Sequence, residues 1–526
     1  MALIAPHTDS IARPVGRVPT TPPRQSRNGA RLAAHATSEK DILTQLDERV
    51  PTAFYWKLTL LSTLGGFLFG YDTSNIGAAL NFVPYHLSSF WSGYLVAGAS
   101  VGAAVGAISA GTLTDRFGRK KLLVVDAAIY AIGAILSAVT PDAAVLLAAR
   151  TLIGVAIGAD SAIATAYIAE YAPKGRRGSL SMLQQWMITV GILVAYLIAL
   201  VILRAAPGSA GTVDWRLILG LGAVPALIGL VLRSTMPESP RWLMRQGQFE
   251  RAANALNSFG MEVSADEVKS AARRLHREEQ RQRRRANWTP GLRRALTVVC
   301  GFFVFQQITG INVPLYYGPH LLGPIFQGSG SSKVASAIAG VEVTSIMTAV
   351  NVAATYFGFR YIDRIGRRKL ALGGFLSMAV FALVAAAGLG FLSGDAKLVL
   401  VMIGLDFFIA SFAVGVGGTG WLLQGEVFPT AVRGKAAATG ASVDWLANFA
   451  LIEVFPVWNA GIGLDWVLVC FAGLCVVAIV FVFRFLPETK GLSVEEVEEV
   501  FEREAAGDGA RSTTAPEKQR TIGLAH

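Results

Sequence analysis

The chain has 526 residues, of which 53% are hydrophobic and only 16% are charged, and its mean hydropathy is +0.48. This composition excludes a string of ordinary soluble domains and indicates an integral membrane protein. The net charge of +11 does not indicate nucleic-acid binding, because the basic residues cluster in alternate loops between apolar segments, as cytoplasmic loops of membrane proteins do.

Twelve apolar segments are each long enough to cross roughly 30 Å of hydrocarbon as a helix. We therefore expect an all-α polytopic membrane protein. An even number of spans with the basic loops on one side predicts that both termini are cytoplasmic, and the expected location is the plasma (inner) membrane. The predicted spans cover roughly residues 54–83, 88–113, 122–140, 144–169, 180–203, 215–236, 293–325, 334–359, 369–392, 397–427, 436–460 and 464–486.

The predicted spans divide the chain into five parts. Residues 1–50 contain no apolar run and are expected to form a disordered cytoplasmic tail, with a transit peptide or a misassigned start codon as open alternatives. Residues 51–236 form the N-terminal six-helix half, and residues 293–486 form the C-terminal half. Residues 237–292 are expected to be a small cytoplasmic helical linker, in which Ser264 and Glu267 have capping-box spacing. Residues 487–526 form a cytoplasmic C-terminal tail.

Three charged motifs occur twice, with about 250 residues between the copies. The pairs are Asp115 to Lys120 with Asp363 to Arg368, Glu170 to Gly178 with Glu426 to Gly434, and Pro237 to Ser239 with Pro487 to Thr489. Three motif pairs at nearly one spacing indicate two homologous six-helix halves. This is the plan of a transporter that carries its binding site between two rocking halves.

Other motifs identify the class more narrowly: Gly70-Tyr71-Asp72, Pro237 to Trp242, Gln306 to Asn312, and Pro487 to Gly491. With these motifs the chain resembles the sugar porter family of the major facilitator superfamily over about residues 54–500. The resemblance implies a charged network that latches the cytoplasmic helix ends when the site faces outward. Its members here are expected to be Asp115, Arg116, Arg119, Glu170, Arg177, Asp363, Arg364, Arg367, Glu426 and Arg433.

Ionisable residues inside the predicted spans are costly and therefore mark candidate functional sites. Counting 1.5 Å per residue places Asp72 and Arg150 at similar depth, so the two side chains can pair. An acid that alternates between a cation and a desolvated cavity is a plausible proton site. The resemblance adds that proton-coupled members carry an acid at the position of Asp72. The alternative is a static buried ion pair.

Sugar hydroxyls need side chains that both donate and accept hydrogen bonds. Gln306, Gln307 and Asn312 supply three amides on one predicted helix, just before Pro314 and Gly318, where we expect the helix to break. The resemblance adds further members of the substrate site, namely Gln185, Asn351 and Trp421.

Two departures from the family pattern affect the predicted site. Asp444 stands where related glucose carriers commonly have a neutral amide, and it could bind a ligand hydroxyl, take a proton or favour a different substrate. Before Trp421, glycines replace the usual prolines, so a glycine hinge is expected there. Further acids at membrane depth have no assigned role: Asp126, Asp160, Glu342, Asp406 and Glu453.

The sequence thus predicts a secondary active transporter that moves a monosaccharide or polyol by proton symport with alternating access. A sugar uniporter and a non-transporting sugar sensor are the alternatives. An enzyme is not expected, because no nucleophile–base pair or metal cluster has plausible spacing. The expected partners are the sugar or polyol, the proton and the lipid bilayer, with no cofactor beyond the proton gradient, no nucleic acid, and a monomer as the functional unit.

Overall fold

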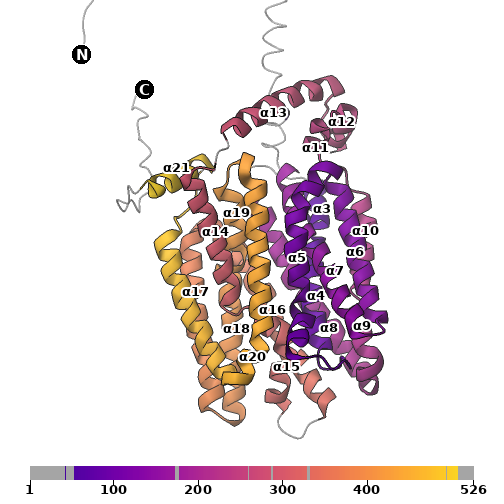
Figure 1. The fold of residues 1–526 in the computed structure, drawn as a ribbon, viewed down its shortest axis with the longest axis vertical. Coiled ribbons are helices and arrows are strands. Elements are labelled where there is room, and N and C mark those ends of the chain that lie inside the picture. Colours follow the sequence, from indigo (N-terminus) through magenta and orange to yellow (C-terminus); the bar gives the residue numbers. More distant parts are fainter. Residues whose placement is uncertain are drawn as a thin grey trace, which may run out of the picture.

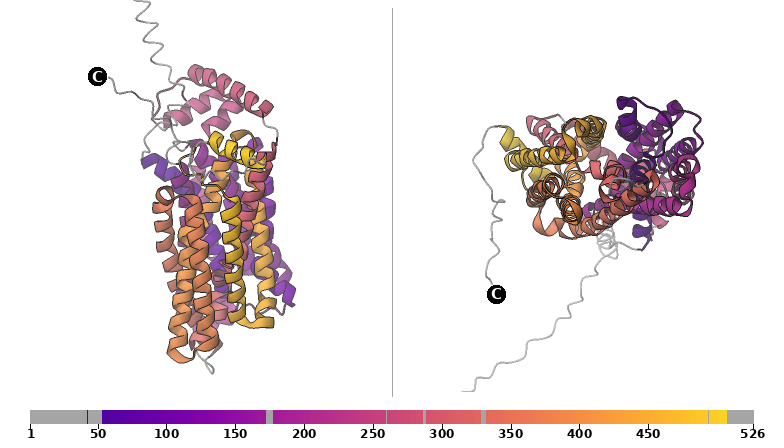
Figure 2. Two further views of the ribbon diagram at one scale, coloured as in Figure 1. Left: turned by 90° about the vertical axis from the view of Figure 1, so that its left-hand side faces the viewer. Right: turned by 90° about the horizontal axis from the view of Figure 1, so that it is seen from below.

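The computed structural model describes residues 42, 53–171, 177–258, 260–285, 288–327, 332–492 and 494–506. Its described elements are helices, so the all-α fold class expected from the sequence is confirmed. Two bundles of long helices stand side by side (Figures 1 and 2). We call them the N half and the C half. Short helices lie at one end of the bundles, which we call the insert end (Figure 1).

The N half begins with α3 (Ala53–Ser62) and α4 (Leu64–Ala79), which follow one another across Thr63. Its long apolar helices are α5 (Ser89–Phe117), α6 (Arg119–Val139), α7 (Ala143–Tyr171) and α8 (Arg177–Ala205). The last candidate span of the N half consists of four short helices in succession: η2 (Pro207–Ser209), η3 (Ala210–Asp214), α9 (Trp215–Gly220) and α10 (Ala223–Ser234).

The C half contains α14 (Pro290–Ile308), α15 (Asn312–Gln327), α16 (Lys333–Ile365), α17 (Arg367–Phe391), α18 (Gly394–Gly415), α19 (Gly417–Val427) and α20 (Thr430–Phe485). With 56 residues, α20 is too long for one crossing of a bilayer about 30 Å thick. Gly463, at φ 82° and ψ 157°, divides it into two helices.

Ten described segments are long and apolar enough to cross a membrane. One of them, Val432–Phe485, contains the division at Gly463, and the interrupted path of α3 and α4 is not among the ten. With these two adjustments, the described helices agree with the twelve spans expected from the sequence. The helices leave large apolar side chains exposed on the outer surface of the bundles, such as Val201, Phe391 and Phe483, as a lipid-facing surface requires.

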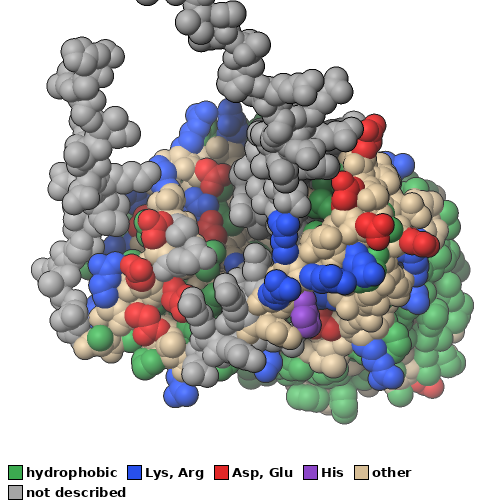
Figure 3. Space-filling view, turned by 90° about the horizontal axis from the view of Figure 1, so that it is seen from above, with side chains coloured by type: hydrophobic (Ala, Val, Ile, Leu, Met, Phe, Trp, Pro, Cys, Tyr) green, Lys and Arg blue, Asp and Glu red, His purple; other side chains and the backbone are tan. Residues whose placement is uncertain are grey.

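The insert end carries α11 (Pro240–Arg245), α12 (Phe249–Ser258) and α13 (Ala265–Arg285), followed after the C half by α21 (Val494–Ala505). Charged side chains gather on this face of the molecule (Figure 3). The capping box at the start of α13 is confirmed: Glu267 Oε2 accepts from Ser264 N–H at 2.8 Å, and Ser264 Oγ accepts from Glu267 N–H at 3.3 Å. The hydrogen bonds that the Glu267 carboxylate accepts from the backbone N–H and the hydroxyl of Ser264 hold the pKa of Glu267 below its usual value.

Two of the expected helix boundaries are wrong. The helix that carries the predicted amides does not break at Pro314 and Gly318 but at residues 309–311, where Gly310 has φ 93°. A Cβ at Gly310 would lie 2.4 Å from the Phe471 ring, so tertiary packing selects the break. Pro314 instead sits in the first turn of α15, where its missing N–H has no helical partner to lose. The first span also ends earlier, at Ala79.

Candidate functional site

A cavity lies between the two halves, with walls from α4, α7 and α8 on one side and from α14, α15, α16, α18, α19 and α20 on the other. The volume open to the centre of a water molecule is about 90 Å³, which is room for several waters. All seven residues that the sequence placed in the substrate site line it: Gln185, Gln306, Gln307, Asn312, Asn351, Trp421 and Asp444.

A chain of hydrogen bonds crosses the cavity wall. Gln307 Nε2 donates to Asp444 Oδ1 at 2.7 Å, and Gln307 Oε1 accepts from Asn312 Nδ2 at 2.7 Å. Asn312 Nδ2 also donates to Asn448 Oδ1 at 3.0 Å, and Asn448 Nδ2 donates to Ser100 Oγ of α5 at 2.9 Å. Because a carboxylate only accepts, Asp444 sets the orientation of Gln307 and, through it, of the following amide. The chain therefore joins the C half to the N half.

Gln306 and Trp421 occupy the cavity wall near the break between α18 and α19, while Gln185 of α8 and Asn351 of α16 line the cavity from other helices. This break falls at Val416, which has φ −112° and ψ −47°, within the expected glycine-rich hinge. Gln306 Nε2 donates to the carbonyl of Gly417 at 2.9 Å and so ties α14 to the start of α19. The Trp421 ring packs edge-on against Phe303, with centroids 5.2 Å apart.

Asp72 of α4 and Arg150 of α7 form a buried ion pair beyond the cavity wall. Both side chains are shielded from solvent, and Arg150 Nε also donates to the carbonyl of Leu95 at 3.2 Å. Thr73 follows Asp72 and lines the cavity, and its Oγ1 donates to the Tyr316 hydroxyl of the C half at 3.5 Å. A change at Asp72 is therefore one residue away from a contact between the halves.

The two halves also meet at the end of the bundles away from the insert. Tyr196 OH donates to the carbonyl of Leu315 at 2.6 Å, and Arg204 Nη2 pairs with Glu342 Oε1 at 2.5 Å. The cavity lining instead extends from its centre toward the insert end, where it includes Gly65, Thr165 and Gln184. The structure thus holds the halves together at the far end, with the cavity displaced toward the insert end.

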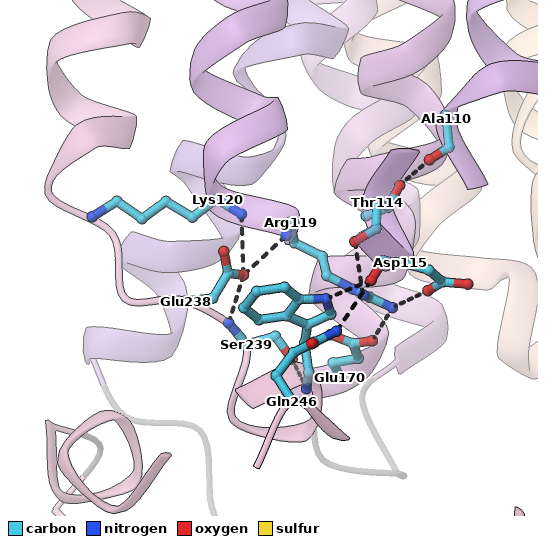
Figure 4. Close-up of polar contacts among 10 residues, drawn as sticks. Ala110, Thr114, Asp115, Arg119, Lys120, Glu170, Glu238, Ser239 and Gln246 are labelled. Atoms are coloured by element: carbon cyan, nitrogen blue, oxygen red, sulfur yellow. Dashed lines mark hydrogen bonds and ion pairs between the residues drawn. The ribbon is translucent and has the colours of Figure 1, made fainter. Parts of the chain in front are cut away.

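Arg119 organises the charged residues at the insert end of the N half (Figure 4). Its Nη2 lies 3.2 Å from Asp115 Oδ1 and 2.9 Å from Glu170 Oε1, and its Nη1 donates to the carbonyl of Thr114. Glu238 caps the start of α6, since its Oε1 accepts from the backbone N–H groups of Arg119 at 2.9 Å and Lys120 at 3.2 Å. A carboxylate at a helix N-terminus is favoured by the helix dipole.

Arg367 repeats this arrangement in the C half. Its guanidinium binds both oxygens of Glu426, at 2.7 and 3.2 Å, and its Nη2 lies 2.9 Å from Asp363 Oδ1. Glu488 Oε1 accepts from Arg367 N–H at 3.0 Å at the start of α17, while Thr489 Oγ1 donates to Glu426 Oε2 at 2.9 Å. The ion pairs described for Arg119 and Arg367 join helices of the same half.

The other expected members of the charged network are placed less centrally. Arg116 lies over the ring of Phe117, Arg364 is exposed, and Arg433 Nε donates to the carbonyl of Phe428 at 2.9 Å. Arg177 starts α8, but its side chain lies outside the described residues.

Comparison with known proteins identifies the family. The family described as "Sugar (and other) transporter" matches residues 58–501. The chain belongs to this sugar transporter family. It is 34% identical over 473 residues to the arabinose-proton symporter of Bacillus subtilis, covering 88% of this chain and 99% of that one. It is 35% identical to the glucose transporter GlcP of Staphylococcus epidermidis, covering 85% and 97%.

A solved structure supports the same family. The xylose transporter XylE of E. coli, in a partially occluded inward-open conformation, matches with a TM-score of 0.72 and 28% identity, covering 84% of this chain and 100% of that one. The resemblance to major facilitator sugar porters is thereby confirmed, and the chain is a multi-pass membrane transporter rather than an enzyme.

The cavity of this sugar transporter also contains polar residues that the sequence reasoning missed. Asn448 lies on the same face of α20 as Asp444, four residues later, so helical spacing could have found it. Gln184 Oε1 accepts from Thr165 Oγ1 at 3.2 Å, and both residues line the cavity. Asp160 lines it as well, although no role was predicted for this acid from the sequence.

Proposed function

We propose that this protein is a secondary active transporter that moves a monosaccharide or polyol together with a proton by alternating access. The observation that carries the proposal is the cavity between the halves, which the predicted amides line and in which Gln307 and Asn312 form a chain of hydrogen bonds, beside a buried acid–arginine pair. The names of the relatives, an arabinose-proton symporter and a glucose transporter, agree with this substrate class.

Sugar binding is assigned to Gln185, Gln306, Gln307, Asn312, Asn351, Trp421 and Asp444. An amide can donate to one hydroxyl and accept from another, and the indole face of Trp421 offers an apolar surface to the C–H side of a sugar ring. Because Gln307 is oriented by Asp444 and Asn312 by Gln307, little order has to be created in these two side chains when the sugar binds.

Proton coupling is assigned to Asp72 and Arg150. While Asp72 is ionised, its pair with Arg150 holds α4 against α7. A proton on Asp72 removes the ionic attraction, so the two side chains separate more readily. Since Thr73 contacts Tyr316, this change is transmitted to the contact between the halves. Protonation of Asp72 is then linked to closure of the two halves at the end away from the insert.

The charged insert end is proposed to face the cytoplasm, with both termini on that side of the plasma membrane, since basic loops favour the cytoplasmic face. The cavity then faces inward in this structure. In the outward-facing state, the clusters around Arg119 and Arg367 latch the cytoplasmic ends. We propose that one chain in the lipid bilayer is the transporting unit, because the cavity is complete within it.

Uptake into proteoliposomes tests the proposed function. Purified protein is reconstituted, and uptake of labelled monosaccharides and polyols is followed with and without an imposed pH gradient. We expect at least one of these compounds to accumulate against its own concentration gradient when the lumen of the proteoliposomes is more alkaline than the outside solution. Uptake that only equilibrates, whatever the pH gradient, would favour a uniporter, and binding without uptake would favour a sensor.

A further inference from the structure

A second buried charge cluster lies in the N half, closer to the insert end than Asp72 and Arg150. Arg233 of α10 extends between Asp126 of α6 and Asp160 of α7. Its Nη1 lies 3.0 Å from Asp126 Oδ1 and 2.7 Å from Asp160 Oδ1. The side chain of Arg233 is 1% exposed and those of both acids are 4% exposed. We call these three residues the N-half triad.

Arg233 has no spare capacity to neutralise a second acid. Its guanidinium also donates to the carbonyls of Leu61 at 3.2 Å, Ser62 at 3.2 Å and Leu123 at 3.0 Å. The Oδ2 atoms of Asp126 and Asp160 are buried and have no hydrogen-bond partner in the described part of the chain. Asp160 Oδ1 also has no hydrogen-bond partner there, since its contact with Arg233 is an ion pair only, so the triad holds one cation, two carboxyl groups and three carboxyl oxygens without a hydrogen bond.

Charge counting shows what this arrangement lacks. With both acids ionised, the triad carries a net charge of about −1 in a site that water does not solvate, and an uncompensated buried charge costs several kcal/mol. One proton on either carboxyl makes the triad neutral and supplies an O–H donor. Because both carboxyl groups contact the same Nη1 atom, the proton belongs to the pair rather than to one residue.

The triad has a route to water. Asp160 lines the cavity between the halves, on the part that extends toward the insert end. Its carboxyl group occupies the space next to Gly65, where an added Cβ would lie 1.3 Å from Asp160 Oδ2. The absence of a side chain at Gly65 is what allows this acid to reach the cavity wall.

No other described cation competes for the two acids. Tyr130 of α6 and Tyr167 of α7 donate their hydroxyls to the carbonyls of Leu68 and Pro237. Of the other charged groups on the packed elements, Asp72 pairs with Arg150. Arg216 on α9 lies at the far end, where it donates to the carbonyls of Ala138 and Thr140. The insert end carries the others: Lys57 on α3, Asp115 and Arg116 on α5, Arg119, Lys120 and Lys121 on α6, and Glu170 on α7.

The fold itself does not require these charges, as the C half shows. The offset from Asp115 to Asp363 carries Asp126 onto Gly374, and the offset from Glu170 to Glu426 carries Asp160 onto Val416. The offset from Pro237 to Pro487 carries Arg233 onto Phe483. In the C half, a Cβ at Gly374 would lie 3.0 Å from Val416 Cγ2, so the equivalent helices pack together without any charge.

We propose that Asp126 and Asp160 bind one exchangeable proton next to Arg233, forming a second protonation site between Asp72 and the insert end. The proton attaches to a carboxylate oxygen of the pair and leaves to cavity water, and no other bond changes. Along α7, Asp160 is ten residues from Arg150, roughly 15 Å. The inference deepens the proposed function, on which its role in transport rests, by adding a proton station on the cytoplasmic side of the site.

Infrared spectroscopy of the full-length protein in lipid at pH 7 tests this site without any need for transport. A protonated carboxylic acid has a C=O stretching band apart from the carboxylate bands. Asp126→Asn and Asp160→Asn each leave one acid with one arginine, which needs no proton. We expect both variants to lose the same share of the band, and the exposed-acid control Asp395→Asn to lose none. In the wild type, the part of the band that these variants lose should shift in frequency in D₂O and decrease in intensity as the pH rises.

A second variant removes the dependence on single substitutions. The combined change Asp126→Asn, Asp160→Asn, Arg233→Met removes all three charges at similar side-chain volume and leaves no unpaired charge, and it should lose the same share. Absence of the band in the wild type at pH 7, or an unchanged band in the single and combined variants, would overturn the proposal.

In proteoliposomes, Asp160→Asn should flatten the dependence of sugar exchange on the pH at the insert end. If the wild type shows no uptake of any sugar, the proposed function fails, while the infrared result still decides whether the site exists.

Discussion

In the N half, the loop glycine Gly118 has φ 93°, and its counterpart Gly366 in the C half has φ 105°. A Cβ would lie 2.3 Å from Glu238 in the first case and 2.5 Å from Glu488 in the second. The two copies of the motif therefore place a carboxylate against the next helix in the same way. The halves have kept the contacts that close their helix ends.

Their interiors differ. The N half buries Arg150 and Arg233 with aspartates, whereas the C half surrounds the cavity with Gln306, Gln307 and Asn312. Under the proposed assignments, the proton sites lie in the N half, and the sugar-binding residues lie in the C half except for Gln185 of α8. Asp444 departs from this pattern, because it is an acid of the C half and lines the cavity.

The largest effect is expected from Asp72→Asn. An imposed gradient of one pH unit supplies about 1.4 kcal/mol, enough for tenfold accumulation at one proton per sugar. The variant should reduce this accumulation to equilibration, because the proton site is lost while the amides remain. Sugar counterflow at equal pH, which needs binding but no gradient, should persist. Retained accumulation would break the assignment of coupling to Asp72.

Arg119→Ala and Arg367→Ala compare the repeated clusters. Each change leaves a partly buried glutamate without its cation, so each should destabilise the protein by about 3 kcal/mol. The apparent unfolding temperature in detergent measures the effect, with the exposed Arg116→Ala as control. A difference between the two variants of more than about 1 kcal/mol would show that the clusters are not energetically equivalent.

Gln307→Ala tests the sugar side of the comparison. It removes the donor to Asp444 and the acceptor for Asn312, so we expect KM for sugar to rise about 10- to 100-fold, corresponding to about 1.4–2.8 kcal/mol. The accumulation ratio at saturating sugar should stay coupled to the pH gradient. The exposed amide variant Gln280→Ala serves as control. Loss of coupling without a change in KM would reverse the assignment.

The smallest effects are expected from Glu238→Gln and Glu488→Gln. The amide oxygen still accepts the backbone hydrogen bonds, but the favourable interaction of the charge with the helix N-terminus is lost, at about 0.3–1 kcal/mol each. Matched small decreases in unfolding temperature would support equal capping in the two halves. Destabilisation that is unchanged at high salt would argue against the dipole contribution, since salt screens it.

The sequence predicted those features that repeat or follow helical spacing. The length of the apolar segments located the spans, and counting 1.5 Å of rise per residue predicted that Asp72 and Arg150 pair. The N-half triad could not be predicted this way. Arg233 lies at the end of a predicted span, where basic residues are common, and its partners are more than 70 residues away in the sequence. The break at Gly310 was missed because it depends on the Phe471 ring rather than on the neighbouring prolines.

The two hydrogens of Asn312 Nδ2 are both engaged by protein acceptors while no ligand is present. A sugar hydroxyl that accepts from Asn312 Nδ2 must therefore replace Gln307 or Asn448 as the acceptor. Such an exchange contributes to the binding free energy only the difference between two similar hydrogen bonds. A carrier built this way recognises its cargo by geometry and holds it loosely, which favours rapid unloading on the far side of the membrane.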